Sequence, residues 1–255
     1  MKKILVGVGL LLLVGGVVWL GWRLFGSPGG SKGPAKWSNE YYVNLLQNVQ
    51  LPNLKALEVT PPITGLEEPD KHIRVLAEAR GYRLQAVPTG QLVDLEQVNA
   101  QPALVGDWNE LKAAAKNEVG ITLTIVSGYR SVELQRQVFL TQFDKATKEG
   151  LGRSYRSQDI TSGELDEVIN KVLGEFSIPG YSRHHTGYSL DIEDTSSGAS
   201  FEQFEQTKGF EWLSRNQYEN ARRFGFIPGY PVGATKLGPN AEPWEIVWVG
   251  KDNLR

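Results

Sequence analysis

The sequence contains no cysteine, and its 255 residues include only three histidines, His72, His184 and His185. The absence of cysteine excludes disulfide bonds, thiolate nucleophiles and cysteine-ligated zinc. Any metal site must therefore use histidine, carboxylate or water ligands. Neither sign of charge dominates either, because 27 basic residues stand against 29 acidic ones and the formal net charge is -2. No overall field selects nucleic acid as a partner, and we expect none.

The longest uncharged stretch runs from Ile4 to Trp22. As a helix it would be about 28 Å long, close to the hydrocarbon thickness of a bilayer. Lys2 and Lys3 precede it and favour an N-terminus inside the cell, although basic residues also follow. A cleavable signal peptide is the alternative, but its apolar core is usually about 7 to 15 residues long. We expect a single-pass anchor over residues 1–25, which contacts the cell membrane through residues 4–25 and leaves the rest of the chain extracytoplasmic.

The remainder of the chain divides by composition. Residues 26–36, rich in glycine, proline and serine, predict a flexible linker because they have nothing to bury. Residues 37–101 predict a small N-terminal cap region with helices near Asn39–Gln50 and Asp70–Arg80. Residues 102–255 predict the main domain.

We expect Asp70 to be the N-cap of the second of these helices and Gly81 to end it. His72 would lie in the first turn of that helix, where no second ligand stands four residues later, so we do not assign it to a metal site.

The main domain predicts helices near residues 107–117, 132–148, 162–173 and 211–224, and strands near residues 121–126, 188–192 and from 245 onward. Strands and helices do not alternate as they do in a parallel doubly wound sheet. The pattern therefore favours an α+β fold.

The segment from Ser182 to Asp194 carries the first candidate ligands. His184 and Asp191 would face opposite ways in a strand, and in a helix they would lie about 10 Å apart along the axis. Only a turn brings both to one ion, and Gly187 permits such a turn. By itself, the pair is equally consistent with purely structural roles, in which the histidine caps a turn and the aspartate ends a strand.

Two further segments carry charged candidates. Glu245 shares strand parity with Val247 and Val249, so its carboxylate should be partly buried and should need a cation, a metal or hydrogen-bond donors. Arg130 follows a strand-to-helix turn, where it could stabilise a developing negative oxygen, while Ser131 caps the helix. Taken singly, these residues fit an edge-strand glutamate and a surface arginine as well.

Together and in this order, the segments resemble the VanY-like D-alanyl-D-alanine carboxypeptidases, within the superfamily of lysostaphin-type peptidases and the hedgehog domain. The resemblance covers roughly residues 104 to 250. It rests on SGYRS at 127–131 followed by Gln135, S-x-H-x-x-G-x-S-x-D from Ser182 to Asp191, F-x-x-T at 204–207, WL at 212–213, FGFI at 224–227 and EPW at 242–244. The implied fold is a small antiparallel sheet flanked by helices, with residues 102–255 as the catalytic domain.

The resemblance implies a zinc-dependent carboxypeptidase that hydrolyses the terminal D-alanyl-D-alanine bond of peptidoglycan stem peptides. It implies that His184 and Asp191 ligate zinc, that Glu242 is the general base, and that Arg130 contacts the scissile carbonyl and its developing oxyanion. The residues expected to contact substrate are Ser182, Gln135 and Tyr129.

The third ligand departs from the family pattern, E-P-W-H, because Glu245 replaces the final histidine. Zinc accepts carboxylate oxygen at about 2.0 to 2.2 Å, so Glu245 can be a ligand, and a second carboxylate would make manganese possible. We expect His185 to face away from His184. The alternatives are a catalytically impaired peptidoglycan-binding relic, an L,D-carboxypeptidase or an endopeptidase.

Overall fold

The computed structural model describes residues 36–255. Its α-helices are α1 (Asn39–Asn48), α2 (Glu67–Ala79), α3 (Val105–Val119), α4 (Val132–Leu151), α5 (Ser157–Thr161), α6 (Asp166–Leu173) and α7 (Lys208–Arg222). Its strands are β1 (Leu54–Lys55), β2 (Val87–Pro88), β3 (Val93–Leu95), β4 (Val98–Ala100), β5 (Leu123–Ser127), β6 (Ser189–Asp194), β7 (Phe226–Pro228) and β8 (Glu245–Trp248). Four short 3-10 helices complete it: η1 (Pro102–Leu104), η2 (Arg183–Thr186), η3 (Phe201–Gln206) and η4 (Lys251–Leu254).

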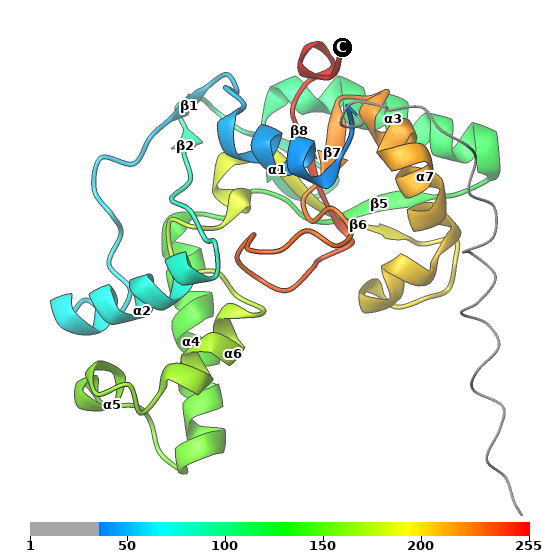
Figure 1. Ribbon diagram of the computed structural model, residues 1–255. Coiled ribbons are helices and arrows are strands. Elements are labelled where there is room, and N and C mark those ends of the chain that lie inside the picture. The colour runs from blue at the N-terminus through cyan, green and yellow to red at the C-terminus, as the bar shows by residue number, and fades with distance from the viewer. Residues whose placement is uncertain (1–35) are drawn as a thin grey trace, which may run out of the picture. The chain divides into compact units, whose positions relative to one another are not determined.

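The main sheet is antiparallel throughout, with strand order β5-β6-β8-β7 (Figure 1). In β6, one of the two central strands, apolar and polar side chains alternate between the two faces of the sheet. Leu190 and Ile192 are fully buried in the hydrophobic core, and Asp191 between them projects from the other face. The predicted α+β fold with a small antiparallel sheet is confirmed, and the strand alternation already decides which face of the sheet can carry polar chemistry.

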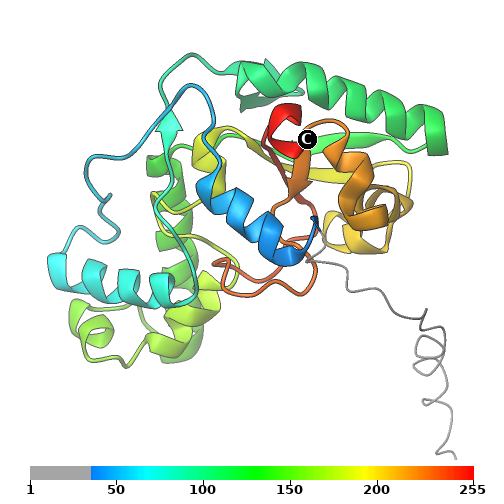
Figure 2. The ribbon, with the colours of Figure 1, turned by 45° about the horizontal axis from the view of Figure 1, so that its top comes forward.

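The apolar face of the sheet packs against α3 and α7 through a core that includes Trp108 and Trp212. Helix α1 joins the same core, because the ring centroids of Tyr42 and Tyr218 lie 6.1 Å apart. Figure 2 shows α1 lying beside α7. Residues 37–101, the predicted cap region, therefore belong to the same compact unit as the rest of residues 36–255.

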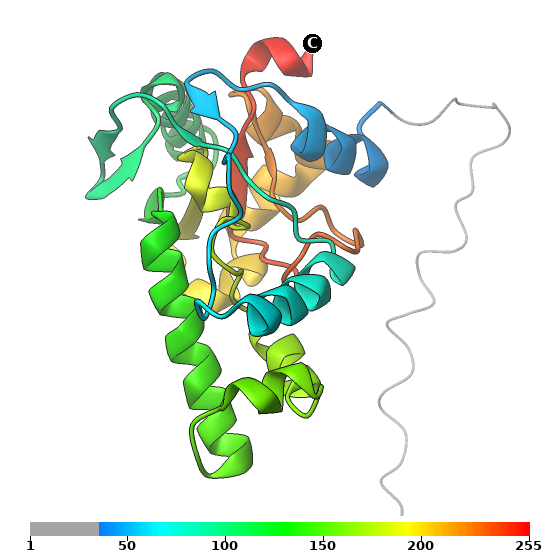
Figure 3. The same cartoon turned by 90° about the vertical axis from the view of Figure 1, so that its left-hand side faces the viewer.

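A second hydrophobic core lies where α2, α4, α5 and α6 meet (Figures 1 and 3). Phe139 and Phe143, one turn apart on α4, stack with ring centroids 6.0 Å apart and are completely buried. Ile73 of α2 and Ile169 of α6 close this core. The start of α4 is thereby fixed beside the end of β5, where Ser131 accepts a hydrogen bond from the amide of Leu134, as predicted for a helix cap.

Two predicted helix boundaries are wrong. Helix α2 begins at Glu67 instead of Asp70, because Pro69 fits in a first helical turn, whose amides have no helical partner. The buried Asp70 carboxylate instead accepts hydrogen bonds from the amides of Ile63 and Thr64 in the preceding loop. The helix predicted near residues 162–173 begins only at Asp166, as α6, because Gly163, whose φ is 80°, lies in the turn between it and the separate short helix α5.

Within residues 36–255, no helix is both long enough and apolar enough to cross a membrane. The anchor predicted for residues 1–25, and all of the predicted linker except Lys36, lie outside the described residues.

Candidate metal centre

The register of the sheet brings two carboxylates together. Asp191 on β6 lies directly opposite Glu245 on β8. Side chains at directly opposite positions project from the same face, and like charges there repel each other. Both residues are buried, with 8% and 3% of their surfaces exposed. The pair therefore needs positive charge from neighbouring groups.

His184 supplies the third group from η2. Gly187 ends this turn with φ 72°, and the chain then enters β6. The prediction that a turn at Gly187 brings His184 and Asp191 together is confirmed. Nε2 of His184 lies 3.3 Å from Oδ2 of Asp191 and 3.5 Å from Oε2 of Glu245. Nδ1 lies 2.6 Å from the carbonyl oxygen of Gly128. A neutral ring that donates this bond from Nδ1 leaves the Nε2 lone pair facing both carboxylates.

The spacing of these three atoms fits a shared ion better than direct ion pairs. Hydrogen bonds between charged nitrogen and oxygen atoms are usually about 2.7 to 2.9 Å long. Ligands arranged tetrahedrally about 2.0 to 2.1 Å from one ion are about 3.3 Å apart, close to the observed 3.3 and 3.5 Å. One ligand atom from each residue lies within 4.8 Å of the others. Among the described residues, no donor satisfies the buried Oδ1 of Asp191. The cluster thus fits one divalent ion.

Burial and the neighbouring charges perturb these groups strongly. Burial alone would lower the pKa of His184, but Asp191 and Glu245 outweigh it and raise that pKa to about 10. Burial alone would raise the pKa of Glu245, but Arg183 and His184 lower it to about 2. Burial, with repulsion from Glu245 and Asp191, raises the pKa of Glu242 to about 8. The neighbouring cations thus hold the Glu245 carboxylate as an anion, while the carboxylate of Glu242 beside it becomes a stronger base.

Arg183 is a member of the site that the sequence predictions missed. Its Nε donates to Oε1 of Glu245 at 2.6 Å, and its guanidinium lies 4.2 Å from the centre of the Tyr230 ring. The side chains of Arg183 and Glu245 are only 14% and 3% exposed. A signal did exist in the sequence, because a buried Glu245 requires a cation and an arginine directly precedes His184.

A cleft of about 220 Å³ opens beside the cluster. Arg130, Ser182 and Glu242 line it together with the three candidate ligands. Gln135 and Tyr129, which we predicted to contact substrate, are not among the lining residues.

Gln135 is completely buried and both ends of its carboxamide are used. Its Oε1 accepts from Arg130 at 2.9 Å and its Nε2 donates to the carbonyl of Ser177 at 2.6 Å. Gln135 therefore positions Arg130 instead of facing the cleft. Tyr129 is half-buried, and its amide donates to the carbonyl of Asn99.

The other two histidines lie outside the cluster, as predicted. Nε2 of His185 accepts a hydrogen bond from the amide of Gly180, and its Nδ1 lies 2.7 Å from the carbonyl oxygen of Arg130. Burial lowers the pKa of His185 to about 4, so it is a neutral structural residue. His72 lies beyond the first turn of α2, which begins at Glu67, and it pairs with Asp166 on α6 at 2.6 Å.

Comparison with known proteins agrees with this geometry. The model of the VanY D-alanyl-D-alanine carboxypeptidase family matches residues 97–251, which include every residue of the cluster and its cleft. The chain belongs to this family. The predicted family and the predicted enzyme class, a carboxypeptidase, are thereby confirmed.

A D-alanyl-D-alanine carboxypeptidase of Enterococcus faecalis is 25% identical to this VanY family member over 247 residues, which cover 91% of this chain and 78% of that protein. One from Enterococcus faecium is 33% identical over 125 residues, 48% of this chain and 38% of that protein.

Two solved structures share the fold. VanYB in complex with D-alanine-D-alanine superposes with a TM-score of 0.50 at 23% identity, covering 64% of this chain and 80% of the other. A variant of a vancomycin-resistance D,D-pentapeptidase VanY, solved with Zn(II), gives a TM-score of 0.51 at 22% identity, covering 70% and 91%.

Proposed function

We propose that the chain is a zinc-dependent D,D-carboxypeptidase that removes the terminal D-alanine of peptidoglycan stem peptides, with His184, Asp191 and Glu245 as the zinc ligands. The observation that carries the proposal is the spacing of 3.3 and 3.5 Å from Nε2 of His184 to the two carboxylates. The VanY relatives support the choice of metal and substrate, since one was solved with Zn(II) and another with D-alanine-D-alanine.

When bound, zinc would supply Lewis acidity and lower the pKa of a water molecule to about 7. The chain's own residues would do the rest. Glu242 lines the same cleft as the ligands, so its carboxylate is placed to take a proton from the attacking water and return it to the leaving amine. Arg130 lines the cleft with its guanidinium fixed by Gln135, so it can stabilise the oxygen of the scissile carbonyl as negative charge develops.

Location follows from the substrate and from the N-terminal sequence. We propose that residues 4–25 anchor the chain in the cell membrane and that the carboxypeptidase domain lies on the extracytoplasmic side. This proposal is supported by the uncharged stretch from Ile4 to Trp22 and by a substrate that lies outside the cytoplasm. Protease added to intact spheroplasts should degrade the domain, whereas full protection until the membrane is ruptured would contradict it.

The enzymatic proposal is tested with the full-length chain in detergent. We expect about one equivalent of zinc by elemental analysis, D-alanine release from a stem pentapeptide, and loss of that release with chelator. The absence of both bound zinc and D-alanine release would refute the proposal. Peptide binding that chelator does not affect, without any release, would identify a binding relic. Release from a tetrapeptide but not from a pentapeptide would identify an L,D-carboxypeptidase instead.

A further inference from the structure

We propose that Arg183 is a positioning residue that enables Glu245 to replace histidine as the third zinc ligand. It does so by orienting the Glu245 carboxylate and by compensating its charge. This inference rests on the proposed zinc-dependent function and extends it to a residue outside the ligand set.

The orientation follows from how the two oxygens of one carboxylate are divided. Oε1 of Glu245 accepts from Nε of Arg183 at 2.6 Å, while Oε2 lies 3.5 Å from Nε2 of His184. With one oxygen held by the arginine, the other is aimed at the point that His184 and Asp191 also face. A glutamate side chain has more rotatable bonds than a histidine side chain and loses more conformational entropy when it binds a metal. The hydrogen bond from Arg183 restricts the Glu245 side chain beforehand and so reduces this entropy loss.

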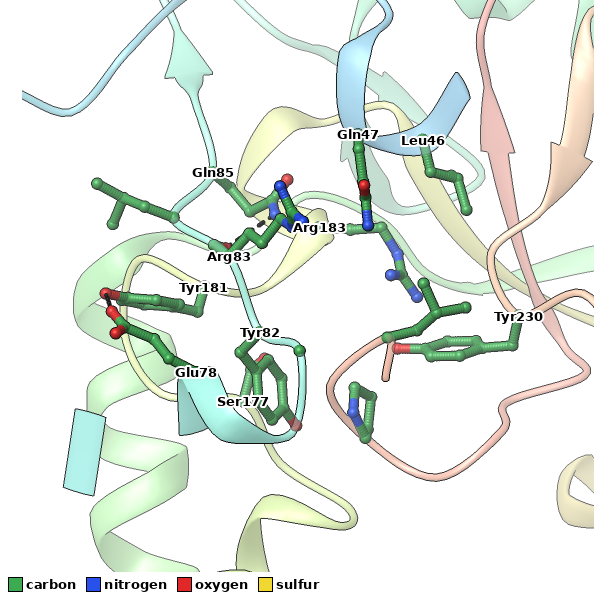
Figure 4. A pocket seen from close by; sticks show the side chains of 14 residues that line it. Leu46, Gln47, Glu78, Tyr82, Arg83, Gln85, Ser177, Tyr181, Arg183 and Tyr230 are labelled. Carbon is green, nitrogen blue, oxygen red and sulfur yellow. Dashed lines mark hydrogen bonds between the residues drawn. The ribbon is translucent and has the colours of Figure 1, made fainter. Parts of the chain in front are cut away.

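Arg183 is itself held in place. Its guanidinium lies over the Tyr230 ring, 4.2 Å from the centre, and Figure 4 shows the side chain reaching toward that ring. Its backbone belongs to η2, the same short turn that presents His184. Within residues 36–255, Glu245 is the only acidic residue with which Arg183 forms an ion pair. The ion-pairing capacity of Arg183 is therefore used on the Glu245 carboxylate.

Arg183 also balances the charge of the site. In zinc peptidase sites with two histidines and one carboxylate, a divalent ion leaves one net positive charge. With one histidine and two carboxylates, the ligands cancel the ion's charge completely. Arg183 returns one positive charge within hydrogen-bonding distance of a ligand. The site of this chain therefore has the same total charge as a two-histidine site, and it keeps the ability to polarise a carbonyl group.

The test measures zinc affinity by competition with a chromophoric chelator, using the full-length protein. Arg183→Met keeps an apolar stem over Tyr230 but removes the charge and the donor. We expect it to weaken zinc binding about 10- to 100-fold. Arg183→Lys, which retains a hydrogen-bond donor for Oε1 of Glu245, should recover part of that loss.

The decisive comparison is a double-mutant cycle with Glu245→His. In the histidine background no carboxylate needs orienting, so Arg183→Met should change zinc affinity by less than about 3-fold. A control is Arg153→Met, which removes another arginine–carboxylate pair, to Asp159 at 2.5 Å, away from the metal cluster. That variant should bind zinc like the wild type. Circular dichroism of each variant shows whether it is folded.

The outcomes separate the two proposals. Wild-type protein that neither binds zinc nor releases D-alanine refutes the proposed function. Wild-type protein that binds zinc, with Arg183→Met equally tight, refutes only the role of Arg183. An equal loss of affinity in the glutamate and histidine backgrounds would also refute it, because a merely structural arginine would act in both.

Discussion

Replacing Gly229 by alanine should displace the Glu245 carboxylate without substituting any of the proposed ligands. Gly229 follows β7, and its amide donates to the Glu245 carbonyl at 2.8 Å. A Cβ at this position would lie 2.4 Å from Oε1 of Glu245 and 3.0 Å from its Cδ. The sequence therefore uses glycine here because the carboxylate occupies the space of a side chain.

The size of the effect follows from these distances. Non-bonded heavy atoms normally approach to about 3.5 Å, so the carboxylate must move by about 1 Å. Metal sites tolerate displacements of only about 0.2 Å in ligand distance. We expect Gly229→Ala to weaken zinc binding about 10- to 100-fold, which corresponds to about 1.4 to 2.7 kcal/mol. Overpacking should also lower the free energy of unfolding by about 1 to 3 kcal/mol.

The assay compares zinc titrations of Gly229→Ala and Gly106→Ala, the latter being an exposed helical glycine where a Cβ meets no heavy atom within 4 Å. Gly106→Ala should bind zinc like the wild type. If folded Gly229→Ala bound zinc with wild-type affinity and released D-alanine at the wild-type rate, Glu245 would not be a ligand in the geometry described.

Three further outcomes follow from the site. Glu242→Gln should reduce kcat for D-alanine release by at least about 100-fold while zinc content stays at the wild-type level, and undiminished kcat would remove Glu242 from the role of base. Arg130→Ala should lower kcat about 100- to 1,000-fold with little change in zinc affinity, and an effect on zinc affinity alone would contradict its role at the carbonyl. Because the pKa of His184 is raised to about 10 without metal, His184 carries a proton below that pH and must lose it to bind zinc. Zinc affinity should therefore rise with pH between about 7 and 9. Calorimetry at pH 9, above the pKa of about 8 of Glu242, in buffers of different ionisation enthalpy should detect about one proton released; no release would contradict the protonated state.

Local patterns predicted most of the fold because the sequence is locally consistent. The apolar run before Ser127 became β5, Ser131 capped α4, and the β-branched run after Glu245 became β8. The predictions failed where tertiary contacts decide the outcome. Aspartate is a preferred residue at helix N-caps, yet the Asp70 carboxylate accepts hydrogen bonds from the loop amides of Ile63 and Thr64. Capping rules consider only the first residues of the helix and do not include such a loop.

The clustering of the three candidate ligands was predictable in part, but the residues around them were not. The turn at Gly187 follows from spacing, and the need of Glu245 for a cation follows from strand parity. Which cation satisfies it depends on the register of β6 against β8, and a pattern within one strand does not specify register between strands. Gln135 illustrates the same limit, since only the packing of α4 reveals that its carboxamide holds Arg130 and does not face the cleft.

The most direct test of the account is an anomalous difference map at the zinc absorption edge, from crystals of the zinc-loaded protein. We predict one peak about 2.0 to 2.2 Å from Nε2 of His184, an oxygen of Asp191 and Oε2 of Glu245, with Oε1 still on Arg183. A peak bound by His184 and Asp191 alone, with both oxygens of Glu245 on Arg183, or no peak in this cleft at all, would contradict the three-ligand site.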